Sequence, residues 1–186
     1  MKPSLLGALT LALAPLSAAQ VPPRFGYAVA RDPLLRREGL LLIDLAGGNT
    51  LELGPLARGG LAGLERAPEG ALLAFDPATA ELVELSPLDG RERARTALPI
   101  PPPGPGSPCG LALDAGGRLL VACGTPASLF EIDLRKPSKA KLRGELPGSA
   151  IGLAALGAGL LALLAREERA LLALRPVPGS PVPLRG

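Results

Sequence analysis

The sequence contains an internal repeat, and this repeat limits the fold more than any single segment does. A glycine–leucine pair opens an apolar stretch three times, with its glycine at Gly63, Gly110 and Gly152. In every copy a further apolar run begins with a leucine 19 residues after that glycine, at Leu82, Leu129 and Leu171. A partial earlier copy lies at residues 40–45. The repeat has to be interpreted first, because a missed repeat gives the wrong fold.

The spacing predicts an all-β fold, a small β-propeller of about four blades. Counted from Leu40, the corresponding apolar runs begin 42, 47 and 42 residues apart. A period of roughly 40 to 50 residues with four short apolar segments is typical of propeller blades, each a four-stranded antiparallel sheet. The blades are expected near residues 24–56, 62–99, 109–147 and 150–186. The first has no room for an innermost strand. Residues 182–184 either supply that strand or form the outer strand of the fourth blade.

Chain breakers support strands over long helices. The chain has 24 glycines and 22 prolines among 186 residues, and six of those prolines fall within residues 99–108. Proline cannot donate to a strand ladder, so this segment is expected to be an exposed crossing between blades. Residues 160–174 consist of strong helix formers, and residues 149–165 are an uncharged run near the lower limit of a membrane span. The conserved repeat spacing favours strands there. A soluble helix and a membrane helix remain the alternatives.

One stretch carries a resemblance to a known group. Residues 107–122, Ser-Pro-Cys-Gly-Leu-Ala-Leu-Asp-Ala-Gly-Gly-Arg-Leu-Leu-Val-Ala, resemble the repeat of bacterial propellers of the NHL, gluconolactonase and streptogramin-lyase group. In that repeat a Pro-x-Gly-apolar-Ala-apolar-Asp segment turns at a glycine and returns as an apolar strand. The match is good in the third predicted blade, partial in the second and fourth, and poor in the first. The resemblance implies a propeller fold and says little about function.

The resemblance also implies a face for ligand binding. In this group the loops between second and third strands share one face with the loops between blades, and ligands bind there. Ordinary turn formers and solvated loop charges are the alternative explanation for the side chains on this face. The candidate ligand-binding residues on it are Arg31, Asp32, Arg36, Asp76, Thr125, Ser128, Arg166 and Glu167.

The sequence departs from the catalytic members of that group. The resemblance implies a divalent cation held by Glu and Asn or Asp in lactonases, and an essential histidine in streptogramin lyases. This chain has no histidine, and its single asparagine, Asn49, lies in a predicted turn. We therefore expect no catalytic residue, no metal site and no cofactor. The favoured function is a non-catalytic binding or scaffold propeller of the cell envelope, whose partner is an unknown protein or envelope ligand. A lactonase-like hydrolase acting on a small carbohydrate-derived substrate is the alternative.

Charge and chain ends restrict location and partners. The formal net charge of +3 is too small to indicate nucleic-acid binding. Lys2, the apolar residues 5–16 and the small residues ending at Ala19 together predict a signal peptide over residues 1–19. The mature chain is then secreted or periplasmic, with no stable membrane insertion. A homodimer that completes the ring is an alternative to a monomer that closes on itself.

Basic residues alternate along two predicted outer strands, at 91, 93 and 95 and again at 139, 141 and 143. Alternation places each set on one strand face. Such charges either prevent a blade edge from pairing with another chain or meet an anionic envelope polymer or lipid surface.

The two cysteines are expected to form a disulfide. A turn centred on Gly116 places residues whose numbers sum to 232 opposite each other, so Cys109 faces Cys123 in an antiparallel pair. Directly opposed cysteines are close to bridging distance, and an exported chain meets an oxidising compartment. Two reduced cysteines or a redox site are the alternatives.

Removal of the leader gives the first testable prediction. We expect the mature protein to begin at Gln20, because Ser17 and Ala19 satisfy the small-residue requirement around a cut after Ala19. N-terminal sequencing of protein recovered from outside the cytoplasm measures this. Recovery of intact Met1 in that fraction would contradict it.

Overall fold

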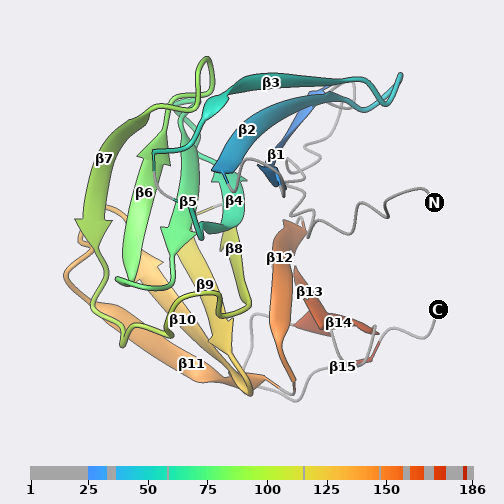
Figure 1. The fold of residues 1–186 in the computed structure, drawn as a ribbon. Helices are drawn as coiled ribbons and strands as arrows, with labels where there is room; N and C mark the ends of the chain where they lie inside the picture. The colour runs from blue at the N-terminus through green and yellow to red at the C-terminus, as the bar shows by residue number, and fades with distance from the viewer. Residues whose placement is uncertain are drawn as a thin grey trace.

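The protein is described by a computed structural model that covers residues 25–32, 37–57, 59–114, 116–146 and 148–156, and the strands at 160–165, 170–174 and 182–183. Over these ranges the chain forms only strands, turns and irregular segments, and the strands make antiparallel sheets (Figure 1). Within the same ranges no helix has the length and hydropathy that a membrane crossing requires. The all-β prediction is confirmed.

Four sheets follow one another along the chain, and consecutive strands pair within each. The first contains β1 (Phe25–Asp32), β2 (Arg37–Asp44) and β3 (Thr50–Pro55). The second contains β4 (Ala62–Arg66), β5 (Leu72–Asp76), β6 (Glu81–Leu85) and β7 (Glu92–Ala97). The third contains β8 (Cys109–Leu113), β9 (Arg118–Gly124), β10 (Ala127–Asp133) and β11 (Ala140–Leu146). The fourth contains β12 (Ala150–Leu156), β13 (Leu160–Ala165), β14 (Ala170–Leu174) and β15 (Val182–Pro183).

The sheets are arranged as blades around a centre. Figure 1 shows β4, β8 and β12 nearest that centre and β7 and β11 on the outside. Among the described residues the first sheet has three strands, and β1 is its inner edge. Val182 pairs with Ala173 of β14, so the C-terminal strand is the outer strand of the fourth sheet and does not complete the first. This settles the two alternatives for that segment.

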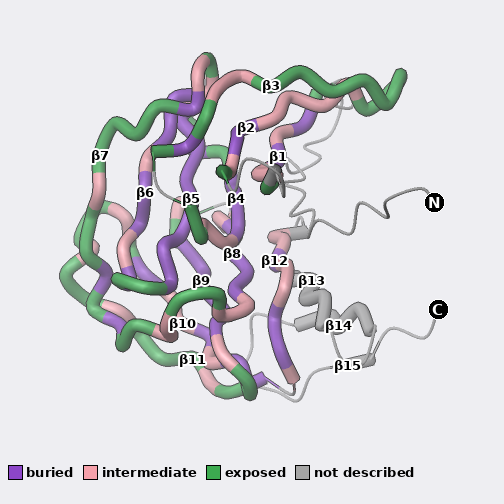
Figure 2. Tube along the Cα trace, viewed as in Figure 1, coloured by how far each residue is buried: buried purple, intermediate pink, exposed green. Residues whose placement is uncertain are grey.

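Apolar side chains fill the spaces between neighbouring sheets, where Figure 2 shows the buried residues. Leu40 of the first sheet packs with Leu72 and Val83 of the second. Phe75 of the second sheet packs with Leu111 and Ile132 of the third. Leu129 of the third packs with Leu153 of the fourth. Successive residues of a strand point to opposite faces, so they face the preceding and the following sheet in turn. Because both faces are covered, consecutive residues of these strands are apolar.

The proline-rich segment crosses from the second sheet to the third. Residues 99–108 contain no strand, and Pro101 and Pro102 are exposed, as predicted. Ile100 is 6% exposed and anchors the segment in the core between the two sheets. The Gly104 N–H donates to the Pro77 carbonyl at 3.0 Å. These contacts hold the crossing against the loop that joins β5 to β6.

The leucine- and alanine-rich stretch that begins at Ala150 is a β-hairpin. β12 and β13 pair antiparallel, with Leu153 opposite Leu163, and β14 pairs with β13 in turn. Both helical alternatives are therefore excluded for these strands. Pairing within a four-stranded sheet overrides the intrinsic helix propensity of leucine and alanine.

The third sheet confirms the predicted register and disulfide. Leu113 lies opposite Leu119, Leu111 opposite Val121, and Cys109 opposite Cys123. The two cysteines form a disulfide, with their Cα atoms 4.3 Å apart. Cys109 is 3% exposed and Cys123 is 5% exposed, so the bond lies inside the core.

We predict that removing the disulfide destabilises the fold by about 3 kcal/mol, because it closes a loop of about 15 residues in the unfolded chain. Denaturant unfolding with and without reductant measures the difference in free energy of unfolding. The double variant C109A/C123A is the control and should lose its response to reductant. An oxidised protein no more stable than the reduced one would contradict the prediction.

Candidate functional site

The described candidate residues lie at one end of the blades, called here the loop end. Arg31 and Asp32 end β1, Asp76 ends β5, and Thr125 and Ser128 flank the turn between β9 and β10. Asp76, Thr125 and Ser128 therefore lie at the connection between the second and third strands of their sheets. Arg31 and Asp32 lie at the equivalent connection of the first sheet, where β1 takes the place of a second strand. Arg36, Arg166 and Glu167, together with the side chain of Asp32, lie outside the described residues. The ligand-binding role of this set remains a prediction.

Asp76 is held by an ion-pair cluster around Arg95. The Arg95 guanidinium lies 2.9 Å from Asp76, 3.0 Å from Glu81 and 2.7 Å from Glu92. Asp76 also accepts the Ala78 N–H at 3.0 Å, which fixes the turn after β5. The hydrogen bond from Arg95 is the main cause that lowers the pKa of the Glu81 carboxyl. The cluster around Arg95 thus links β5, β6 and β7.

Arg95 departs from the sequence-based expectation. Its side chain is only 14% exposed, whereas the alternating pattern placed it with Arg91 and Arg93 on one outward face. The register of β6 and β7 shifts between Glu84 and Leu85, and this bulge breaks strict alternation before residue 95. The expectation that Arg95 is a surface charge is therefore wrong.

Thr125 is also occupied by an internal contact. Its hydroxyl lies 2.6 Å from the hydroxyl of Ser149, a residue that is 3% exposed and precedes β12. The pair joins the turn of the third sheet to the start of the fourth. Arg31 is exposed and Ser128 is half-buried, so these two remain the loop-end candidates most available to a partner.

Glu65 is a buried carboxyl that the sequence analysis did not select. It lies on β4 and is 6% exposed. It accepts the Arg66 N–H at 3.0 Å and a backbone hydrogen bond from Leu113 of β8, so it bridges two innermost strands. Burial raises its pKa to about 7, although both backbone hydrogen bonds act in the opposite direction.

A second polar network closes the opposite end of the third sheet. Asp114 accepts the Gly116 N–H at 2.8 Å and the Arg118 N–H at 2.9 Å, and its other oxygen accepts Arg118 Nε at 2.7 Å. Burial opposes ionisation of Asp114, but the bonds from Arg118 outweigh it and lower the pKa. Glu131 lies between Arg118 and Arg143. The aspartate of the repeat motif therefore shapes the β8–β9 turn.

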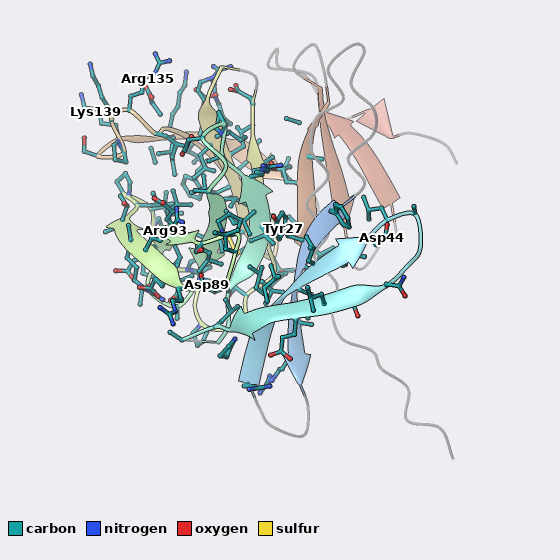
Figure 3. All side chains as sticks on the ribbon, turned by 90° about the horizontal axis from the view of Figure 1, so that it is seen from above. Tyr27, Asp44, Asp89, Arg93, Arg135 and Lys139 are labelled. Carbon is teal, nitrogen blue, oxygen red and sulfur yellow. A yellow bond between two sulfur atoms is a disulfide. The ribbon has the colours of Figure 1, made fainter. Side chains whose placement is uncertain are left out.

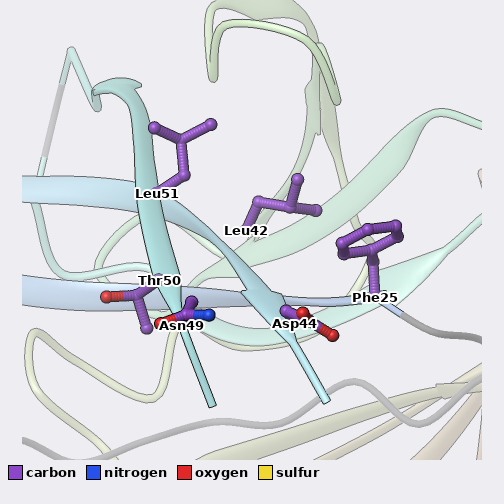
Figure 4. Close-up of a pocket in the computed structure, with 6 residues that line it drawn as sticks. All are labelled: Phe25, Leu42, Asp44, Asn49, Thr50 and Leu51. Atoms are coloured by element: carbon purple, nitrogen blue, oxygen red, sulfur yellow. The ribbon is translucent and has the colours of Figure 1, made fainter. Parts of the chain in front are cut away.

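An open apolar pocket of about 190 Å³ lies on the first sheet. Phe25, Leu42 and Leu51 form its walls, with Asp44, Asn49 and Thr50 at one side (Figure 4). Phe25 is 48% exposed and Leu51 is 60% exposed. One carboxylate and one amide among apolar walls suit an apolar group better than a cation, which needs several converging oxygens.

Basic side chains gather on the outer strands β7 and β11 and on the turn between β10 and β11. Arg93, Arg135 and Lys139 project outward there (Figure 3). Lys136 and Lys141 are exposed beside them, whereas Arg91 pairs with Asp89 at 3.3 Å. A ladder of exposed charges discourages pairing of an outer edge with another chain.

No group of three or more His, Cys, Asp or Glu side chains converges on a metal position in the described part of the chain. Over the same residues, every buried side-chain nitrogen and oxygen has a hydrogen-bond partner. Of the loop-end candidates, Asp76 and Thr125 are thus used to connect strands and sheets.

Comparison with known proteins supports the fold. No family model and no curated protein matches the sequence. Virginiamycin B lyase from Staphylococcus aureus matches in structure with a TM-score of 0.54 at 12% identity, covering 86% of this chain and 52% of the lyase. A protein of unknown function from Bacteroides caccae gives a TM-score of 0.58 at 16% identity, covering 96% of this chain and 61% of that one. A chain of the nidogen/laminin complex gives 0.55 at 13% identity, covering 90% and 76%.

These matches support the β-propeller fold. The chain spans just over half the length of the first two structures, at 52% and 61%. A further structure of the Staphylococcus aureus lyase, with quinupristin, is of a catalytically inactive variant in which a histidine is replaced by alanine.

Glu65 gives a prediction about pH. Its carboxyl binds a proton more tightly in the folded chain, with a pKa of about 7 against 4.5 for an ordinary glutamate. Stability contributed by the protonated form is therefore present below pH 4.5 and is lost as the pH rises to about 7. The difference corresponds to at most about 3 kcal/mol.

We expect Glu65→Gln to remove this loss, because the amide keeps an acceptor oxygen and does not ionise. Free energies of unfolding between pH 4.5 and 7 measure the effect. Glu69→Gln, at an exposed position in the turn after β4, is the matched control and should leave the slope unchanged. An equal slope in wild type and Glu65→Gln would contradict the assignment.

Proposed function

We propose that this chain is an exported, non-catalytic propeller module that binds a protein or envelope ligand at the loop end of its blades. Export is supported by the predicted leader and by the Cys109–Cys123 disulfide, a bond that persists in oxidising compartments. A structural match to the extracellular domain of a putative one-component system, at a TM-score of 0.53 and 13% identity, is consistent with this location.

The observation that carries the proposal is the internal use of polar groups at the loop end. Asp76 is committed to Arg95, and Thr125 to Ser149. Catalysis needs groups that converge on a substrate and change protonation during turnover. Here Asp76 and Thr125 hold strands together, which keeps the loop end in a fixed shape. A fixed surface of this kind suits binding.

The lyase and hydrolase alternatives have less support. The Staphylococcus aureus lyase is inactive when a histidine is replaced, and this chain has no histidine to offer. For hydrolysis, Glu65 has a pKa near that of a general base. However, its carboxyl is buried between β4 and β8 and is bonded to backbone N–H groups.

Site-specific cross-linking tests the proposal. A photo-reactive side chain at Ser128, on the loop end, is expected to form a covalent adduct with a discrete envelope component in producing cells. The same group at Leu88, which is 79% exposed in the β6–β7 turn at the opposite end, is the matched control and should form none. Adducts of equal yield at both positions, or none at Ser128, would overturn the loop-end assignment.

A further inference from the structure

We propose that the inner edge of β1 binds an extended segment of a partner protein, which adds to the first sheet as its innermost strand. The segment is expected to carry a glycine followed by an apolar residue. This surface meets the loop end at Arg31, but the proposal rests on the main chain of β1 and does not depend on the function proposed above.

The first sheet aligns with the second strand by strand. The Leu56 N–H donates to the Glu38 carbonyl at 2.9 Å, and the Leu98 N–H donates to the Ala80 carbonyl at 2.9 Å. Both residues of the second pair lie 42 positions after those of the first. Thus β2 corresponds to β6, β3 to β7, and β1 to β5. In the second sheet β5 is paired on its inner side by β4, whereas β1 is the edge of its sheet.

The same bond fixes which main-chain groups of β1 face that edge. Because the Glu38 carbonyl points to the β3 side, alternation turns Gly39 and Leu41 toward β1, where they pair with Ala30 and Ala28. The N–H and C=O groups of Tyr27, Val29 and Arg31 then point to the inner edge. In the described chain no strand pairs with that edge. Such a row of groups is a template for strand addition.

The innermost strands of the other sheets define what fits. A Cβ atom added to Gly63 of β4 would lie 2.7 Å from the Leu111 Cβ of β8. A Cβ atom added to Gly110 of β8 would lie 2.9 Å from the backbone of Gly152 and 3.0 Å from the Leu153 Cβ of β12. Both β4 and β8 therefore need a glycine where they meet the leucine of the next innermost strand.

The same rule extends to the first sheet. Leu64 of β4 holds the position of Leu111 and Leu153, directly after the repeat glycine. Gly110 pairs with Ala122, which corresponds to Val29 through the aligned strands. A strand added beside β1 would therefore place its glycine opposite Val29 and against Leu64. All three existing copies follow this glycine with leucine, which gives the partner segment its glycine–apolar pattern.

A synthetic peptide provides the test. The probe copies Ser107 to Asp114 with Cys109→Ala, so that it carries the glycine–leucine pair without a thiol. We expect saturable binding to the full chain, with slower hydrogen exchange at the Tyr27, Val29 and Arg31 amides. The matched control peptide also carries Gly110→Val. Its Cβ atom would clash with Leu64, so its affinity should fall by at least about tenfold.

Other outcomes overturn the proposal. Equal binding of the two peptides would remove the glycine requirement, and no binding at millimolar peptide would remove the site. Protection of the three amides in the chain alone would show that its own residues fill the edge. Protection that appears only as a dimer forms would assign the edge to a second copy. Cross-linking at Ser128 tests binding at the loop end, and the peptide tests the edge of β1. Failure of one proposal can therefore be told apart from failure of the other.

Discussion

Packing between the faces of neighbouring sheets is the interaction on which the rest of this structure depends. The strands are short, and a lone sheet of such strands has marginal stability in water. Phe75, Val83 and Ile132 are fully buried because they lie between two sheets. The close approach of the innermost strands, with glycine against leucine, brings these faces together. The turns and ion-pair clusters then fix the conformation of individual loops, while the distance between the sheets is set by this packing.

The repeat made most of this fold predictable from the sequence. A constant distance between glycine and leucine constrains the strand pairs as well as their number, because the turn between two strands determines their register. The opposition of Cys109 and Cys123 followed from that register. The three described strands of the first sheet were also predictable, because short apolar runs at residues 25–30, 40–45 and 50–53 match β1, β2 and β3.

The candidate site was less predictable, because its contacts join residues far apart in the sequence. Asp76 looks like an ordinary turn former beside Pro77, and only the folded sheet brings Arg95 to it. Glu65 looks like a turn-end charge, but its carboxyl lies against the backbone of the next blade. The bulge near Leu85 also disturbs the alternation that a regular strand would keep. Local patterns do not encode such long-range partners.

The order of the sheets has a consequence for how the fold comes apart. Most contacts between blades join sequence neighbours, so resistance to opening is approximately a sum of nearest-neighbour terms, as in solenoids. The third sheet lies between the second and the fourth and is cross-linked internally by its disulfide. The first sheet packs on the second alone among the described sheets. Fraying therefore starts at the two end sheets of the series, the first and the fourth, while the disulfide-linked third sheet persists longest.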